Sequence, residues 1–147
     1  MFKNEFYLQD NEGSFEIYNL GDFELEDGGI ISDLKITFST YGELNNSKNN
    51  VIVVPAWFSG TRKDYESYIA EERALNPSEY FFIVINQFGT GLLSSSHNSP
   101  EPATMENPPK VRMIDYVRAQ HQFISKKLGI GEIALAVGIS KQVLQTI

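Results

Sequence analysis

The chain has 147 residues, of which 41% are hydrophobic and 21% charged, a composition typical of one folded domain or part of one. The net charge of -7 argues against a nucleic-acid partner, because no basic surplus is present to neutralise phosphates. Cysteine is absent, which excludes disulfides, thiolate catalysis and cysteine zinc sites. No apolar run reaches the length of a membrane span and no signal peptide is evident, so we expect a cytoplasmic protein without a membrane partner.

The charges are distributed unevenly along the chain. Residues 1–33 contain nine acidic side chains and a single lysine, whereas residues 110–147 contain six basic side chains and two acidic ones. This pattern is typical of complementary solvated faces.

Residues 15–41 show the alternation of half-buried antiparallel strands. Apolar and polar residues alternate in 15–18, in 23–26 and in 34–41. Asp27-Gly28-Gly29 is a hairpin turn signal. We therefore expect a β-meander with one face in water.

Two continuous apolar runs follow. Residues 51–55 and 80–85 are rich in β-branched and aromatic residues without alternation, which is typical of strands covered on both faces. Between them, residues 64–75 are expected to form a short helix that ends at Asn76-Pro77. A long loop rich in glycine, serine and proline spans 86–110, and loops of this length are usually functional or disordered.

The clearest helix lies near the end of the chain and ends at Gly129, a residue suited to a left-handed helix stop. Asp115 is expected near its start, and Arg118 is expected to have a structural role, in an ion pair or at the boundary between helix and sheet, rather than to bind substrate. Its apolar face is predicted from steps of three and four residues: Ile114, Val117, His121, Ile124 and Leu128.

A further buried strand is predicted at 133–137, directly after this helix. Antiparallel strands followed by strand–helix–strand units predict an α/β fold: a sheet of N-terminal antiparallel strands, then parallel strands with helices. We expect this sheet to be incomplete within the chain.

Gly138-Ile139-Ser140 follows the last predicted strand. A serine on a sharp turn between a buried strand and a helix is how an α/β-hydrolase presents its nucleophile. Gly138 fits the pattern G-x-S-x-G, whereas Gln142 stands where the second glycine is expected. An ordinary serine at the end of a strand is the alternative.

The loop after strand 51–55 is the second candidate element of the site. In α/β-hydrolases this loop supplies one backbone N–H of the oxyanion hole, and the residue after the nucleophile supplies the other. Here the loop begins Ala56-Trp57-Phe58-Ser59-Gly60, and the residue after the serine is Lys141. Core packing of Trp57 and Phe58 is the alternative.

Four separated segments resemble the homoserine O-acetyltransferase-like α/β-hydrolases, in the same order along the chain. The resemblance covers about residues 15–140. The matching segments are Trp57-Phe58-Ser59-Gly60-Thr61-Arg62-Lys63-Asp64, Arg73-Ala74-Leu75-Asn76-Pro77, Asn86-Gln87-Phe88-Gly89-Thr90-Gly91-Leu92-Leu93-Ser94-Ser95-Ser96 and Val117-Arg118-Ala119-Gln120-His121.

The resemblance implies a mechanism through an acyl-serine. Ser140 would be the nucleophile, and the backbone N–H groups of Phe58 and Lys141 would form the oxyanion hole. The partners would be a small-molecule acyl donor, such as acetyl-CoA, and a hydroxyl acceptor or water. No cofactor and no metal are implied, since acetyl-CoA would be a substrate.

In this family the acid and the base of the triad follow the serine, so the resemblance places them beyond Ile147. We therefore expect residues 1–147 to be the N-terminal portion of a single α/β-hydrolase domain that is inactive alone. The alternatives are a non-catalytic truncated or frameshifted fragment and a small interaction module, with a homodimer as one possible assembly.

The two histidines do not occupy the family's catalytic position. His97 lies in the long loop among serines, and His121 lies on the predicted apolar helix face. We expect a loop residue and a half-buried packing residue respectively. Two separated histidines are too few for a metal site.

Overall fold

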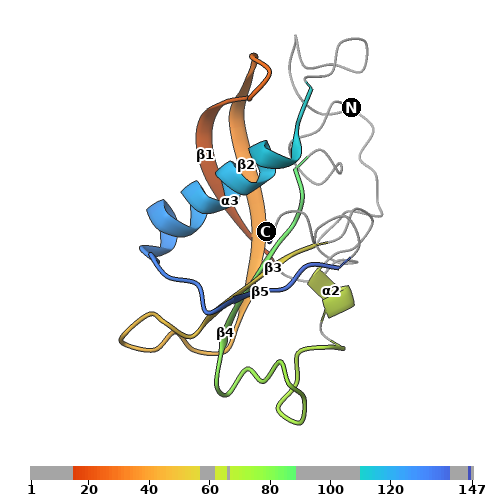
Figure 1. Cartoon of the computed structure of the whole chain (residues 1–147), viewed down its shortest axis with the longest axis vertical. Helices are drawn as coiled ribbons and strands as arrows, with labels where there is room; N and C mark the ends of the chain where they lie inside the picture. The colour runs from red at the N-terminus through yellow and green to blue at the C-terminus, as the bar shows by residue number, and fades with distance from the viewer. Residues whose placement is uncertain (1–14, 57–61, 66, 89–109, 140–145, 147) are drawn as a thin grey trace.

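The computed structural model describes residues 15–56, 62–65, 67–88, 110–139 and 146. The described strands form one mixed sheet in the order β1-β2-β4-β3-β5, and the long helix α3 crosses it (Figure 1). The elements are β1 (Glu16–Glu24), β2 (Ile30–Tyr41), β3 (Val51–Pro55), α2 (Arg62–Tyr65), β4 (Phe81–Ile85), α3 (Met113–Leu128) and β5 (Leu135–Ala136).

β1 and β2 form the predicted antiparallel hairpin. The Leu25 N–H donates to the Gly29 carbonyl at 3.0 Å, and both Gly28 and Gly29 have positive φ angles. The two predicted runs 15–18 and 23–26 belong to a single strand, because β1 continues through a register irregularity at Gly21 and pairs with β2 on both sides of it.

The centre of the sheet confirms the predicted change from antiparallel to parallel pairing. β4 is antiparallel to β2 and parallel to β3, and β3 is also parallel to β5. β3 is buried over its whole length, which explains its run of apolar residues without alternation.

Each face of the sheet has its own apolar core. Val53 and Ile83 point to the face covered by α3, where Phe123 packs against the ring of Phe38 with centroids 4.5 Å apart. On the opposite face, alternate residues of β3 and β4 pack against Tyr65 from α2. The alternation of side chains along each strand therefore divides these apolar runs between two layers.

The prediction of which face of α3 is buried was partly wrong. The helix exists with the predicted stop, since Gly129 has φ 60°. Of the predicted stripe only Ile124 is buried, whereas His121 and Ile114 are exposed and Val117 and Leu128 are half-buried. The buried residues are Asp115, Ala119, Gln120, Phe123 and Ile124. The face of α3 that contacts the sheet is shifted around the helix by about one residue from the predicted stripe, because Phe123 fills the space beside Phe38.

Two other predicted elements are shorter in the structure. The helix expected at 64–75 is only the four-residue α2, and turns follow from Ser67. The strand expected at 133–137 is the two-residue β5, and it is not buried: Ile133 is 43% exposed and Leu135 49% exposed. β5 pairs with β3 on one side and has no partner strand on its other side among the described residues.

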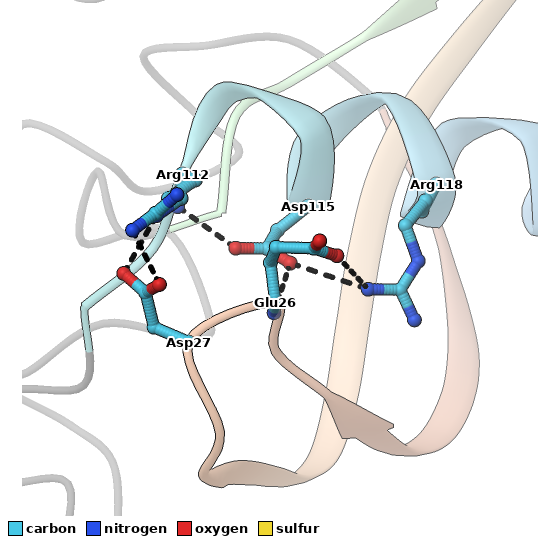
Figure 2. A network of polar contacts seen from close by, with 5 residues as sticks. All are labelled: Glu26, Asp27, Arg112, Asp115 and Arg118. Carbon is cyan, nitrogen blue, oxygen red and sulfur yellow. Dashed lines mark hydrogen bonds and ion pairs between the residues drawn. The ribbon is translucent and has the colours of Figure 1, made fainter.

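A polar network joins the β1–β2 hairpin to the start of α3 (Figure 2). Asp115 is fully buried and accepts the backbone N–H groups of Arg112 and Glu26, both at 2.8 Å. Arg112 pairs with Asp27 through two contacts, and Arg118 lies 3.5 Å from Glu26 and from Asp115. Two acidic residues of the first segment thus meet basic residues of the last, in agreement with the expected complementarity, and the predicted roles of Asp115 and Arg118 are confirmed.

Candidate active site at the carboxyl edge of the sheet

Three parallel strands end at the same edge of the sheet. Pro55, the last residue of β3, is in register with Ile85, the last residue of β4, and Val53 is in register with Ala136 of β5. Ligands of open α/β sheets bind outside the carboxyl ends of such strands. The segments that leave this edge are therefore the ones in which reacting groups are expected.

The residues predicted from the sequence belong to segments that leave this edge but lie outside the described residues. Phe58 follows β3, and Ser140 and Lys141 follow β5. The described chain approaches the serine through Gly138, which is half-buried, and Ile139, which is 38% exposed. Their roles in chemistry stay predictions.

The point at which the chain leaves β3 is fixed by three hydrogen bonds. The Ala56 N–H donates to the Ile85 carbonyl at 2.8 Å, and the side-chain amide of Gln87 donates to the Ala56 carbonyl at 3.2 Å. The Tyr65 hydroxyl donates to the Pro55 carbonyl at 3.1 Å. All five residues are buried, so water does not compete for these groups.

The end of β4 is fixed on its other side by Asn86. Its backbone N–H donates to the Thr37 carbonyl at 2.9 Å, and its side-chain amide donates to Thr37 Oγ1 at 3.0 Å. The Asn86 Oδ1 atom is buried and has no hydrogen-bond partner among the described residues. The edge thus contains a buried acceptor, a feature that native proteins rarely leave unused.

Tyr116 of α3 holds the start of the long loop. Its hydroxyl donates to the Phe88 carbonyl at 3.3 Å, and its ring stacks on that of Phe88 with centroids 4.4 Å apart. Burial, and then the negative charge of Asp115, raise the pKa of the Tyr116 phenol above its usual value of 10.0. Tyr116 therefore remains a neutral donor at neutral pH.

A hollow of about 170 Å³ lies between α3 and the strands β3 and β5. Its walls include Val53 and Pro55 from β3, Val117 and His121 from α3, and Ala136 from β5. Three residues of the stripe predicted for α3, Val117, His121 and Ile124, line this hollow, whereas the sheet contacts the adjacent face of the helix.

Of the two histidines, the structure describes only His121. His121 is exposed, whereas a half-buried packing residue was expected, and His97 lies outside the described residues. Within the described ranges, no group of three or more His, Cys, Asp or Glu side chains is placed to hold a metal ion. No helix in the described part of the chain is both long and apolar enough to cross a membrane.

Polar groups at this edge were missed by the sequence analysis. Asn86 and Gln87 were placed in the long loop and in a segment of the family resemblance without a role of their own, and Tyr65 was placed in a helix. Asn86 and Gln87 do follow a buried strand directly, which is where side chains reach the functional edge of a parallel sheet. Tyr65 carried no comparable signal, because its contact with Pro55 depends on how the chain folds back.

Curated relatives match nearly the whole chain. A probable esterase of Corynebacterium glutamicum is 39% identical over 99% of the chain and 42% of its own length. An ethyl acetate hydrolase of Pseudomonas veronii is 42% identical over 97% of the chain and 41% of its own length. A homoserine O-acetyltransferase of Chlorobium chlorochromatii is 33% identical over 80% of the chain and 35% of its own length. The chain thus spans about two fifths of the length of the two esterases.

Solved structures agree with these relatives. An acetylester hydrolase from Corynebacterium glutamicum superposes with a TM-score of 0.89 at 40% identity, covering 94% of the chain and 40% of that protein. The acetyl esterase MekB superposes with a TM-score of 0.87 at 42% identity, covering 92% of the chain and 39% of that protein. No protein-family model matches the sequence. The fold, the order of the strands and the relatives together show that the chain belongs to the homoserine O-acetyltransferase-like α/β-hydrolases, the group that includes these esterases.

Proposed function

We propose that this chain provides the nucleophile and the oxyanion hole of an enzyme that hydrolyses small acyl esters. The observation that carries the proposal is the common carboxyl edge of β3, β4 and β5, from which the segments containing Phe58 and Ser140 emerge. Identities of 39% and 42% to the esterases, against 33% to the acetyltransferase of Chlorobium, favour water as the acyl acceptor.

The mechanism follows from an activated serine. Ser140 Oγ attacks the ester carbonyl carbon, its proton passes to a general base, and the alcohol leaves with a proton. Water then attacks the acyl-serine, which releases the carboxylic acid and restores the hydroxyl. The N–H groups of Phe58 and Lys141 stabilise the oxyanion formed in each half-reaction.

The acid and the base are proposed to come from outside these residues. Nothing between Lys141 and Ile147 is an aspartate, a glutamate or a histidine. We expect the 147-residue chain alone to show no measurable acyl transfer. Acylation of Ser140 by an activated ester in this chain would contradict that expectation.

A chimaera tests the proposal. The chain replaces the matching stretch of the Pseudomonas veronii ethyl acetate hydrolase, which supplies the remainder, and hydrolysis of p-nitrophenyl acetate and ethyl acetate is measured. We expect turnover, and a loss of about a thousandfold or more in kcat for Ser140→Ala. A Ser140→Ala chimaera that keeps its activity would overturn the assignment of the nucleophile.

The same variant also separates catalysis from folding. In the 147-residue chain, Ser140→Ala should change the free energy of unfolding by no more than about 0.5 kcal/mol. A large loss of stability in a melting experiment would mean that the serine is structural. A folded chimaera without turnover would favour the non-catalytic alternatives, a fragment or an interaction module.

Acyl transfer is the second candidate, because homoserine O-acetyltransferases are among the relatives. It predicts that the chimaera forms O-acetylhomoserine when acetyl-CoA and homoserine are supplied together. Release of free acetate alone would favour the hydrolase.

A further inference from the structure

The end of β3 offers few backbone groups that can hold the chain as it leaves the sheet. Pro55 is the last residue of the strand, and proline has no backbone N–H with which to hold a neighbouring strand. The strand end can therefore be held only through its carbonyl groups and through the next N–H, that of Ala56. Each of these three groups has a hydrogen-bond partner in the structure.

Two of the three partners are side chains from different parts of the chain. Tyr65 reaches back from α2 to Pro55, ten residues earlier, and so closes the base of the loop that follows β3. Gln87 reaches across from the end of β4 to Ala56. Tyr65 is 2% exposed and Gln87 is 7% exposed, so both bonds form in a medium where they are stronger than in water.

We propose that Gln87 and Tyr65 are positioning residues for the oxyanion hole. This inference rests on the proposed function, since it concerns the same site. By fixing both carbonyl groups at the end of β3, they set the direction in which the chain leaves the sheet, and Phe58 lies only two residues beyond Ala56. Neither side chain touches the substrate in this proposal.

The expected effect on catalysis follows from the geometry that an oxyanion hole requires. A backbone donor stabilises the transition state only if it is held about 3 Å from the developing oxyanion. A displacement of about 1 Å caused by a change away from the chemistry can cost up to about a hundredfold in rate. Loosening one of the two side-chain bonds should therefore lower kcat by about tenfold and leave KM within about twofold.

The test uses Tyr65→Phe and Gln87→Met in the chimaera described above. Each variant removes a donor and keeps nearly the same volume. Asn50→Leu is the matched control, because it removes a side-chain amide that donates to the Glu43 and Glu79 carbonyl groups at the start of β3, the end opposite the proposed site. Active sites are titrated with a phosphonate, so that kcat refers only to folded enzyme.

We expect both variants to lower kcat for p-nitrophenyl acetate by about tenfold, the double variant to lower it further, and Asn50→Leu to leave kcat within about twofold. Equal kcat values in all variants would overturn the inference, even if their melting temperatures fall. The Ser140→Ala chimaera separates the two proposals: if it is inactive and the positioning variants are not impaired, only the present inference fails.

The 147-residue chain gives a second measurement that does not need activity. Amide hydrogen exchange reports whether the Ala56 N–H, which donates to Ile85, stays protected. In Tyr65→Phe and Gln87→Met, exchange at Ala56 should accelerate by about tenfold more than exchange at Val137, whose N–H donates to Val53. Equal acceleration at both amides would show a global loss of stability and would contradict a local positioning role.

Discussion

At the residue scale, Asp115 lies at the centre of the polar network that joins the β1–β2 hairpin to α3. It is fully buried at the first turn of α3, yet it accepts two backbone N–H groups and faces the Arg118 guanidinium (Figure 2). A carboxylate tolerates burial only with such partners. The sequence predicted its place near the start of the helix, but the contact with Glu26 depends on how the hairpin packs.

Replacing this carboxylate should destabilise the fold. Asp115→Asn replaces an accepting carboxylate oxygen with an amide NH₂ group, which then faces other hydrogen-bond donors. We therefore expect a loss of about 1–3 kcal/mol in the free energy of unfolding. Asp27→Asn is the matched control: it weakens the more exposed pair with Arg112 and should cost less than about 1 kcal/mol. Urea unfolding of both variants measures the difference, and equal losses would contradict the central role of Asp115.

Tyr116 makes stability depend on alkaline pH. Because its pKa is raised in the folded chain, its contribution is complete below pH 10.0, the value for the unfolded chain, and is lost as the pH rises through the folded value. We therefore expect the free energy of unfolding to fall less steeply above pH 10 in Tyr116→Phe than in the unchanged chain. Urea titrations at several alkaline pH values measure this slope, and parallel curves would contradict it.

At the element scale, two glycines with similar φ angles allow the cost of backbone strain to be measured separately from the cost of a steric clash. Gly28 in the hairpin turn has φ 82° and Gly42 after β2 has φ 78°. A Cβ at Gly28 would meet nothing within 4 Å, whereas one at Gly42 would collide with the backbone carbonyl groups of Tyr80 and Pro77.

Alanine at these positions should therefore have different effects. Gly28→Ala should cost about 1–2 kcal/mol, the strain of a left-handed conformation alone. Gly42→Ala should cost clearly more, because the link between β2 and the turn before β4 must move. Thermal unfolding compares the two variants, and similar melting temperatures would mean that the chain around Gly42 yields easily.

At the scale of the whole molecule, three exposed apolar side chains lie close together in sequence at and beside β5, which has no second partner strand among the described residues. Ile133, Leu135 and Ile139 are all large, apolar and more than one third exposed. Exposed strand edges with apolar side chains favour association with another chain. This surface is where the possible homodimer of the sequence analysis would form.

A charge on this edge should reduce association without unfolding the chain. We expect Leu135→Lys to shift light-scattering masses toward the monomer at high protein concentration, because its side chain already lies in water. The melting temperature should stay nearly unchanged, since surface substitutions usually cost no more than about 0.5 kcal/mol. Equal association of the Leu135→Lys variant and of the unchanged chain would show that the edge beside β5 is not the contact.

Local patterns in the sequence determined much of this fold. Side-chain chemistry within a few residues explains the buried runs in β3 and β4, the Gly28-Gly29 turn, the first turn of α3 with Asp115, and its stop at Gly129. The motifs also determined the family, because short segments around Trp57, Asn86 and Val117 keep their order along the chain.

Only the tertiary structure decided which polar groups meet. Periodicity could not show that the sheet contacts Ala119 and Phe123 and leaves His121 in water, because both stripes of α3 contain apolar residues. It also could not show that Tyr65 and Gln87 hold the end of β3, since those bonds join segments far apart in sequence. Hydrogen bonds between distant side chains depend on the path of the whole chain, whereas turns, caps and buried strands depend on their neighbours in sequence.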